Sequence, residues 1–242
     1  VSILLNAQRK INENNMANKL SLSCSMFSVF DGHGGTACCN YLKDNLHNAL
    51  LSHLDVDGLI IPAVKGVYKQ LDEDYIKMAI EQKHQFAGSC ANTLLVINNS
   101  LIVVNTGDSR AILSMRGGSR VTEASADHKP DKLSEFYRII ESNGELYRMS
   151  ANVKTGQNSF YFARTYAQLK KINELERNSR HLVFGPWRVK PGGLSVSRSF
   201  GDIESKKTHT AQSNSVVTSE PDITEFDLTD VDFAFIACKL IS

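Results

Sequence analysis

The feature that most constrains this chain is an apolar run that ends at a cluster of glycines. The run from Leu22 to Phe30 has the composition of a β-strand, and Asp31-Gly32-His33-Gly34-Gly35 follows it directly. Thr36 is a suitable helix N-cap, and after it apolar residues recur at helical spacing. The order strand, glycine-rich turn, helix predicts a mixed fold in which Asp31 stands where a strand ends.

The other segments alternate between helical and strand patterns. We expect helices from near Pro62 and over residues 131–142, the second ending at Asn143-Gly144. We expect strands at 93–97, 101–105, 110–115 and 231–238, the first two joined by a hairpin turn at residues 98–100. Paired helices beside hairpin-connected strands predict an α+β layered fold with mainly antiparallel sheets.

Composition excludes several classes of protein. The chain has 27 Lys and Arg against 26 Asp and Glu, so a dedicated nucleic-acid binder is not expected. No apolar run is long enough to span a bilayer, and no signal peptide opens the sequence. The 5 cysteines are scattered, which predicts free buried thiols in a reducing, intracellular compartment, cytoplasmic or nuclear.

The segment from Tyr147 to Pro186 differs from the rest because it is polar and basic. Phe162, Tyr166, Leu169 and Leu175 offer one weak helical face. We expect a solvated surface insertion at this segment. The alternative is a specific patch for phosphorylated or acidic partners, since positive charge attracts both.

Two short motifs contain residues suited to chemistry. Asp31 can offer a carboxylate to a hard divalent cation, Gly32 can offer its carbonyl, and His33 can donate a proton near neutral pH. Asp108, in Gly107-Asp108-Ser109-Arg110, is a second candidate ligand. Each motif taken alone is more typical of an ordinary turn.

Taken together, the motifs resemble those of the metal-dependent protein serine/threonine phosphatases of type 2C. The resemblance rests on six blocks in the order that the family shows. They are Phe27-Ser28-Val29-Phe30-Asp31-Gly32-His33-Gly34-Gly35, Gly88-Ser89-Cys90-Ala91, Asn105-Thr106-Gly107-Asp108-Ser109-Arg110-Ala111, Asp127-His128-Lys129-Pro130, Gly193-Leu194-Ser195-Val196-Ser197-Arg198-Ser199-Phe200-Gly201-Asp202 and Glu220-Pro221-Asp222-Ile223.

The resemblance implies a single phosphatase-like domain over residues 1–242, in which about 147–186 is a variable basic flap. Its fold would be two stacked antiparallel β-sheets flanked by pairs of helices, a four-layer sandwich, lacking its C-terminal part in this chain. The implied activity is Mg²⁺- or Mn²⁺-dependent hydrolysis of phosphoserine and phosphothreonine in phosphoprotein substrates by a metal-activated water. We expect a monomer.

The resemblance also implies roles for individual residues. Asp31, the Gly32 carbonyl and Asp108 would bind metal, His33 would protonate the leaving oxygen, and Arg9 would bind the substrate phosphate. Four further residues match family motifs and would either have structural roles or support the metal ligands from behind, namely Asp127, His128, Arg198 and Asp202.

The chain departs from the family pattern at two metal ligands. Asn14 and Lys239 stand where the family has aspartates, and neither side chain carries the negative charge that a dication attracts. Three interpretations follow: a fragment or altered form of an active phosphatase, a catalytically silent pseudophosphatase that binds other proteins, or a part of a longer, normal enzyme.

Overall fold

The computed structural model describes residues 2–10, 23–53, 60–84, 86–206 and 215–238, with the backbone alone for 2–10 and 23. The chain forms two compact units. The first comprises Val1–Asp127, Ser199–Gly201 and Ser219–Ser242, and the second comprises His128–Arg198 and Asp202–Thr218. That the whole chain acts as a single domain stays a prediction.

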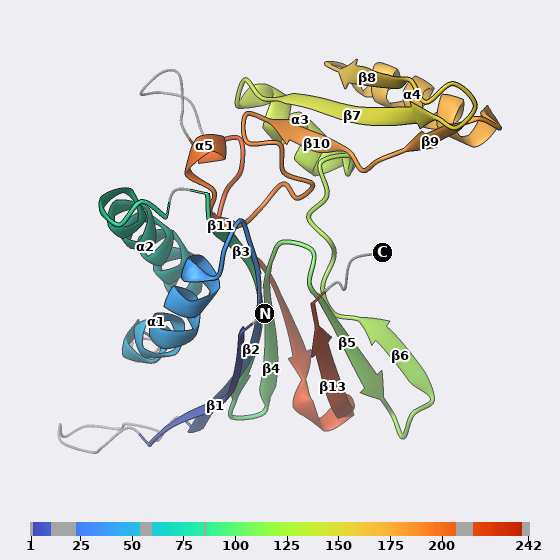
Figure 1. Ribbon diagram of the computed structural model, residues 1–242. Coiled ribbons are helices and arrows are strands. Elements are labelled where there is room, and N and C mark those ends of the chain that lie inside the picture. Colours follow the sequence, from blue (N-terminus) through green and yellow to red (C-terminus); the bar gives the residue numbers. More distant parts are fainter. Residues whose placement is uncertain (1, 11–22, 54–59, 85, 207–214, 239–242) are drawn as a thin grey trace. The chain divides into compact units, whose positions relative to one another are not determined.

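A six-stranded antiparallel sheet forms the centre of the first unit (Figure 1). Its main order is β1-β2-β3-β4-β12, and β11 pairs with the beginning of β3. The strands are β1 (Ser2–Lys10), β2 (Ser23–His33), β3 (Gly88–Ile97), β4 (Ser100–Thr106), β11 (Phe200–Gly201) and β12 (Asp222–Asp227). The predicted hairpin is confirmed, because β3 and β4 are joined through Asn98 and Asn99.

A second sheet of three antiparallel strands has the order β13-β5-β6. Its strands are β5 (Arg110–Met115), β6 (Arg120–Glu123) and β13 (Val231–Ala237), the last preceded by the 3-10 turn η1 (Leu228–Asp230). Inward side chains of both sheets share one apolar core, which includes Leu94, Val103, Leu113 and Ile236. The two sheets are therefore stacked, as expected.

Helices α1 (Ala37–His53) and α2 (Ile60–Glu81) pack against each other and cover the six-stranded sheet (Figure 1). Both show the predicted periodicity, since Leu42, Leu46 and Leu50 of α1 and Tyr68 and Tyr75 of α2 are buried. Helix α1 starts directly after Thr36, the residue predicted as its cap. No helix of the described residues is both long and apolar enough to cross a membrane.

The second unit contains a four-stranded antiparallel sheet of order β10-β7-β8, with β9 also paired to β7. The strands are β7 (Glu145–Asn152), β8 (Asn158–Ala163), β9 (Leu182–Phe184) and β10 (Arg188–Lys190). The helices are α3 (Leu133–Glu141), α4 (Tyr166–Asn178) and the short α5 (Ile203–Lys206). Its core includes Phe136, Leu146, Leu169, Trp187 and Val217.

The segment 147–186, expected to be a solvated surface insertion, keeps most of its side chains exposed or partly exposed, but it is also a folded part of the second unit. The segment forms β7, β8, α4 and β9, and Leu169 is 2% exposed in the core. The predicted helical face also began too early, because Phe162 lies in β8 and the helix starts only after its N-cap residue, Thr165. The polar composition concealed a folded segment, because a few buried apolar residues are enough to fix it to the core.

The α+β class and the antiparallel pairing are confirmed. The expected helix pair on a second sheet takes a different form in the described residues, since α3 and α4 contact the strands of the third sheet. That sheet was not anticipated, because β9 and β10 have only three residues each and give no readable alternation.

Candidate metal and phosphate site

Asp31, Gly32 and His33 form the last residues of β2, paired in register with Cys90, Ser89 and Gly88 of β3. The strand thus runs three residues beyond the expected end at Phe30. The reason is that β3 continues to offer backbone partners up to Gly88. All three residues are partly exposed, so they lie at a sheet end that solvent and ligands can reach.

The glycines after Asp31 are required by close backbone packing. Gly34 has a φ of +64°, and a Cβ there would collide with the carbonyl of Phe86. A Cβ on Gly32 would lie 2.7 Å from the Cys39 Sγ of α1. Only glycine lets the chain leave the strand and enter α1 in this space.

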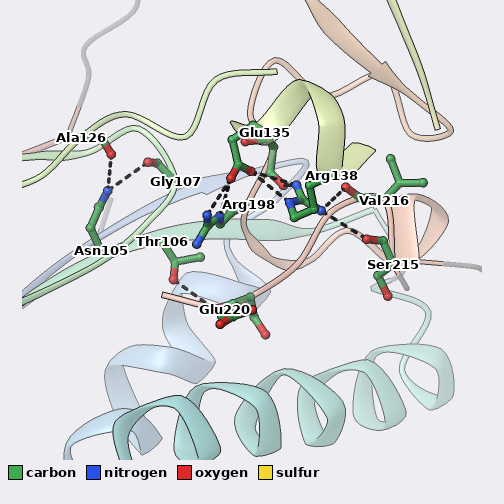
Figure 2. A network of polar contacts seen from close by, with 12 residues as sticks. Asn105, Thr106, Gly107, Ala126, Glu135, Arg138, Arg198, Ser215, Val216 and Glu220 are labelled. Carbon is green, nitrogen blue, oxygen red and sulfur yellow. Dashed lines mark hydrogen bonds and ion pairs between the residues drawn. The ribbon is translucent and has the colours of Figure 1, made fainter. Parts of the chain in front are cut away.

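Asp108 lies in the tight turn between β4 and β5, where Gly107 has a φ of +109° and stands against Cys90. Buried amides fix this turn. Asn105 Nδ2 donates to the carbonyls of Gly107 at 3.2 Å and Ala126 at 2.9 Å (Figure 2). Asn92 Nδ2 in turn donates to Asn105 Oδ1 at 2.9 Å. The sequence motif around Asp108 is therefore a rigidly held loop.

Tertiary pairing brings Asp31 and Asp108 into one electrostatic environment. Burial raises the pKa of Asp31, the negative charge of Asp108 raises it further, and His33 lowers it. The structure thus brings together the two predicted carboxylates and the histidine, although Asp31 ends one strand and Asp108 lies in a turn between two others. Two neighbouring carboxylates repel each other until a cation binds between them.

Cys90 was not predicted as part of this environment. Its thiol donates to Asp108 Oδ1 at 3.5 Å. Burial raises the pKa of the Cys90 thiol well above its usual range, and the charge of Asp108 adds to that effect. The thiol therefore stays protonated and serves Asp108 as a weak donor. The sequence motif Gly88-Ser89-Cys90-Ala91 pointed to this position, but it did not indicate that Cys90 contacts Asp108.

Asp108 also lines a hollow of about 310 Å³, together with Arg110, Ile112, Phe235, Ala237 and Cys238. The charge of Arg110 is already paired at this hollow, because its Nε and Nη2 donate to the two carboxylate oxygens of Asp127 at 2.7 and 3.0 Å. Asp127 therefore serves as a partner for Arg110, which agrees with the structural role expected for it.

The oxygen donors fit a hard divalent cation in kind. Asp31 and Asp108 supply carboxylates and Gly32 supplies a carbonyl, the donor types that Mg²⁺ and Mn²⁺ prefer. Among the described residues, no group of three or more His, Cys, Asp or Glu side chains is placed to hold a metal. Asn14 and Lys239 lie outside the described residues. Arg9 is in β1 opposite Cys24, and its side chain is not described.

A separate polar network lies in the second unit and was missed by sequence reasoning (Figure 2). Glu135, 3% exposed, accepts hydrogen bonds from Arg198 and from Arg138. Arg138 also donates to the carbonyls of Ser197 and Val216, at 2.7 and 2.9 Å. The spacing of Glu135 and Arg138 on one helix was the available signal. Arg198 therefore has a structural contact, as expected for it.

Stacked antiparallel sheets under a helical pair, with carboxylates at a strand end and in a turn, define an α+β sandwich with a candidate cation site. The family model for protein phosphatase 2C matches residues 5–241. The chain belongs to this family.

The relatives and the solved structures that match this chain agree with this assignment. The chain is 36% identical over 214 residues to "Probable protein phosphatase 2C 11" of Arabidopsis thaliana, covering 88% of this chain and 45% of that protein. It is 39% identical over 177 residues to "Probable protein phosphatase 2C 45" of rice, Oryza sativa subsp. japonica, covering 73% and 49%. The chain thus spans about half the length of these relatives.

Among solved structures, a serine-threonine phosphatase 2C from Toxoplasma gondii matches with a TM-score of 0.57 and 22% identity, over 84% of this chain and 64% of that one. A sex-determining protein of C. elegans matches with a TM-score of 0.62 and 17% identity, over 96% and 50%. At these identities the likeness concerns the fold.

Proposed function

We propose that this chain carries the catalytic fold of a Mg²⁺- or Mn²⁺-dependent phosphatase that hydrolyses phosphoserine and phosphothreonine in proteins. The observation that carries the proposal is the placement of Asp31, at the end of β2, opposite Cys90 of β3, whose thiol donates to Asp108 of the β4–β5 turn at 3.5 Å. Family membership supports the reaction class.

Each residue has a defined task in this proposal. Asp31, the Gly32 carbonyl and Asp108 would hold the cation. A bound dication supplies an acidified water and stabilises charge on the phosphoryl oxygens. His33 donates a proton to the seryl or threonyl oxygen as the bond to phosphorus breaks, because an alkoxide leaves poorly. The Arg9 guanidinium would bind the phosphate through paired N–H groups.

The test is calorimetric titration of Mn²⁺ into the chain, with phosphate release from a phosphothreonine peptide followed in parallel. Asp31→Asn removes a negative charge at the site, so we expect Mn²⁺ affinity to fall at least about tenfold and turnover to disappear. Asp44→Asn, on the exposed side of α1, is the matched control and should change neither quantity. Turnover that needs no divalent cation would contradict the proposal.

A silent pseudophosphatase that binds other proteins is the second candidate. It rests on Asn14 and Lys239, which stand where the family has aspartates. A folded chain that binds no Mn²⁺ and releases no phosphate would favour this alternative.

We also propose a reducing, intracellular location and a monomeric state. All 5 cysteines are free, and 4 of them are buried, which suits a reducing compartment. Size-exclusion chromatography with light scattering tests the monomer, and a dimer at micromolar concentration would overturn it.

A further inference from the structure

Two buried asparagines lie side by side in the six-stranded sheet, close to the candidate metal site. Asn92 of β3 and Asn105 of β4 are paired directly opposite each other, so their side chains share one face of the sheet. They are 0% and 2% exposed. Asn92 Nδ2 donates to Asn105 Oδ1 at 2.9 Å, which joins the two side chains. We call these two residues the amide pair.

The amide pair holds the backbone on both sides of Asp108. Asn105 Nδ2 donates at 3.2 Å to the carbonyl of Gly107, the residue before Asp108 (Figure 2). Asn92 Nδ2 donates at 3.2 Å to the carbonyl of Ser109, the residue after it. Because both neighbouring peptide groups are held, the Asp108 carboxylate can point in few directions.

The same two amides attach the β4–β5 turn to the segment that follows β6. Asn105 Nδ2 also donates to the Ala126 carbonyl at 2.9 Å (Figure 2). Asn92 Nδ2 also donates to Ser125 Oγ, at 3.2 Å. Ser125 Oγ in turn accepts from the backbone N–H of Ala111 in β5, at 2.8 Å. The amide pair thus connects the turn with two further stretches of chain.

The turn needs this support because it contains a glycine. Gly107 has a φ of +109°, and a glycine rotates more freely than other residues because it has no side chain. Asp108 follows directly, so a rotation at Gly107 would move its carboxylate. The hydrogen bonds from the amide pair to the carbonyls of residues 107 and 109 oppose that rotation.

Folding stability alone does not explain why amides occupy these two positions. Asn92 Oδ1 is buried and has no hydrogen-bond partner within the part of the chain that the structure describes. Three acceptors surround Asn92 Nδ2, which has only two hydrogens to donate. A buried acceptor without a partner costs free energy, which an apolar pair in the same sheet would avoid. The amide pair is better explained by what it positions.

We propose that Asn92 and Asn105 are positioning residues, which set the direction of the Asp108 carboxylate for binding a divalent cation. This inference rests on the proposed function, because it concerns the same cation site. Neither asparagine is assigned as a ligand of the cation, and each acts through the backbone next to Asp108. Loss of either amide should therefore weaken metal binding without removing a ligand.

The test variants are Asn105→Leu and Asn92→Leu, since leucine branches at the same atom as asparagine but carries no amide. We expect Mn²⁺ affinity, measured by calorimetry, to fall about tenfold or more in each variant. Excess Mn²⁺ should recover most of the lost turnover of a phosphothreonine peptide, because the proposed ligands are all still present. Asn105→Ala, which is smaller, serves as a second variant if leucine prevents folding.

Thr93→Val is the matched control. Thr93 lies next to Asn92 in β3 and is also 0% exposed, but it faces the other side of the sheet. There it shares hydrogen bonds with Ser28 at 2.9 Å and with Tyr68 at 3.3 Å. The variant loses buried hydrogen bonds in the same strand and should leave Mn²⁺ affinity unchanged. Equal loss of affinity in Thr93→Val and Asn92→Leu would overturn the positioning role, since loosening of the strand would explain both.

A second measurement needs no metal. Amide hydrogen exchange over residues 107–111 of the metal-free chain should be at least about fivefold faster in Asn105→Leu than in wild type, because the turn opens more often. The same exchange should be unchanged in Thr93→Val. Exchange in Asn105→Leu at the wild-type rate would show that the amides do not hold the turn, and would overturn the proposal.

The outcomes separate this inference from the proposed function. A wild-type chain that binds no Mn²⁺ would contradict the proposed function, and exchange of the metal-free chain would still decide whether the amides hold the turn. A wild-type chain that binds Mn²⁺, with the same affinity in both leucine variants, would overturn the positioning role and leave the proposed hydrolysis standing.

Discussion

Arg198 donates from both Nε and Nη2 to a single oxygen of Glu135, Oε1, at 3.1 and 2.6 Å. The other oxygen, Oε2, accepts from Arg138 at 2.9 Å. One carboxylate, 3% exposed, thus holds two guanidinium groups whose own side chains are 14% and 25% exposed. Because Arg138 also binds backbone carbonyls, this carboxylate organises several loops of the second unit.

Removing the charge of Glu135 should destabilise the second unit. In Glu135→Gln, two largely buried guanidinium groups lose their counterion, and we expect a loss of about 3 kcal/mol in the free energy of unfolding. Urea unfolding followed by Trp187 fluorescence measures it. Glu141→Gln, at the exposed end of the same helix, should shift the midpoint little. A similar shift in both variants would show that the network contributes nothing special.

The same carboxylate predicts how stability depends on pH. Burial tends to raise the pKa of Glu135, but hydrogen bonds from Arg198 and the charges of both arginines outweigh burial and lower it from 4.5 to about 2. A depressed pKa adds stability above the unfolded value, and this is lost as pH falls from about 4.5 toward 2. The stability gap between wild type and Glu135→Gln should therefore narrow over that interval. A gap independent of pH would contradict the assignment.

His33 should matter most for substrates with a poor leaving group. In His33→Gln, we expect kcat for a phosphothreonine peptide to fall about 100-fold or more, because the alkoxide no longer receives a proton. Nitrophenyl phosphate, whose leaving group departs without a proton, should lose less than about tenfold. Mn²⁺ affinity, measured by calorimetry, should be unchanged. Equal loss on both substrates would point to a role in folding or metal binding.

Gly107 should tolerate no side chain. Gly107→Ala places a Cβ against Cys90 at a φ of +109°, so we expect a loss of about 2 kcal/mol or more in stability and weaker Mn²⁺ binding through Asp108. Gly66→Ala is the control, since a Cβ at this position in α2 meets nothing within 4 Å. It should stabilise the chain by about 0.5–1 kcal/mol, because alanine favours the helix. Thermal unfolding compares the two, and equal stability of both variants would contradict the strain assigned to the β4–β5 turn.

Local sequence patterns predicted much of the first unit. Helix α1, helix α2, the β3–β4 hairpin and β5 fall at or near their expected residues. Each carries its own signal within a few turns or one strand, such as Leu42, Leu46 and Leu50 on one helical face. The motif around Asp31 likewise marked the candidate site, because a glycine-rich exit from a strand can be read locally.

The sequence by itself thus determined many regular elements of the first unit, the family and the candidate chemical groups. Only the tertiary structure decided which distant residues interact, such as Asp31 and Asp108 with Cys90, and Arg198 with Glu135, which lies 63 residues away. It also decided that the polar segment 147–186 contributes strands to a sheet. The physical reason is that the hydrophobic periodicity of a segment indicates only which face of its helix or strand is buried. Partners distant in sequence are chosen by burial and strand pairing, which depend on the whole chain at once.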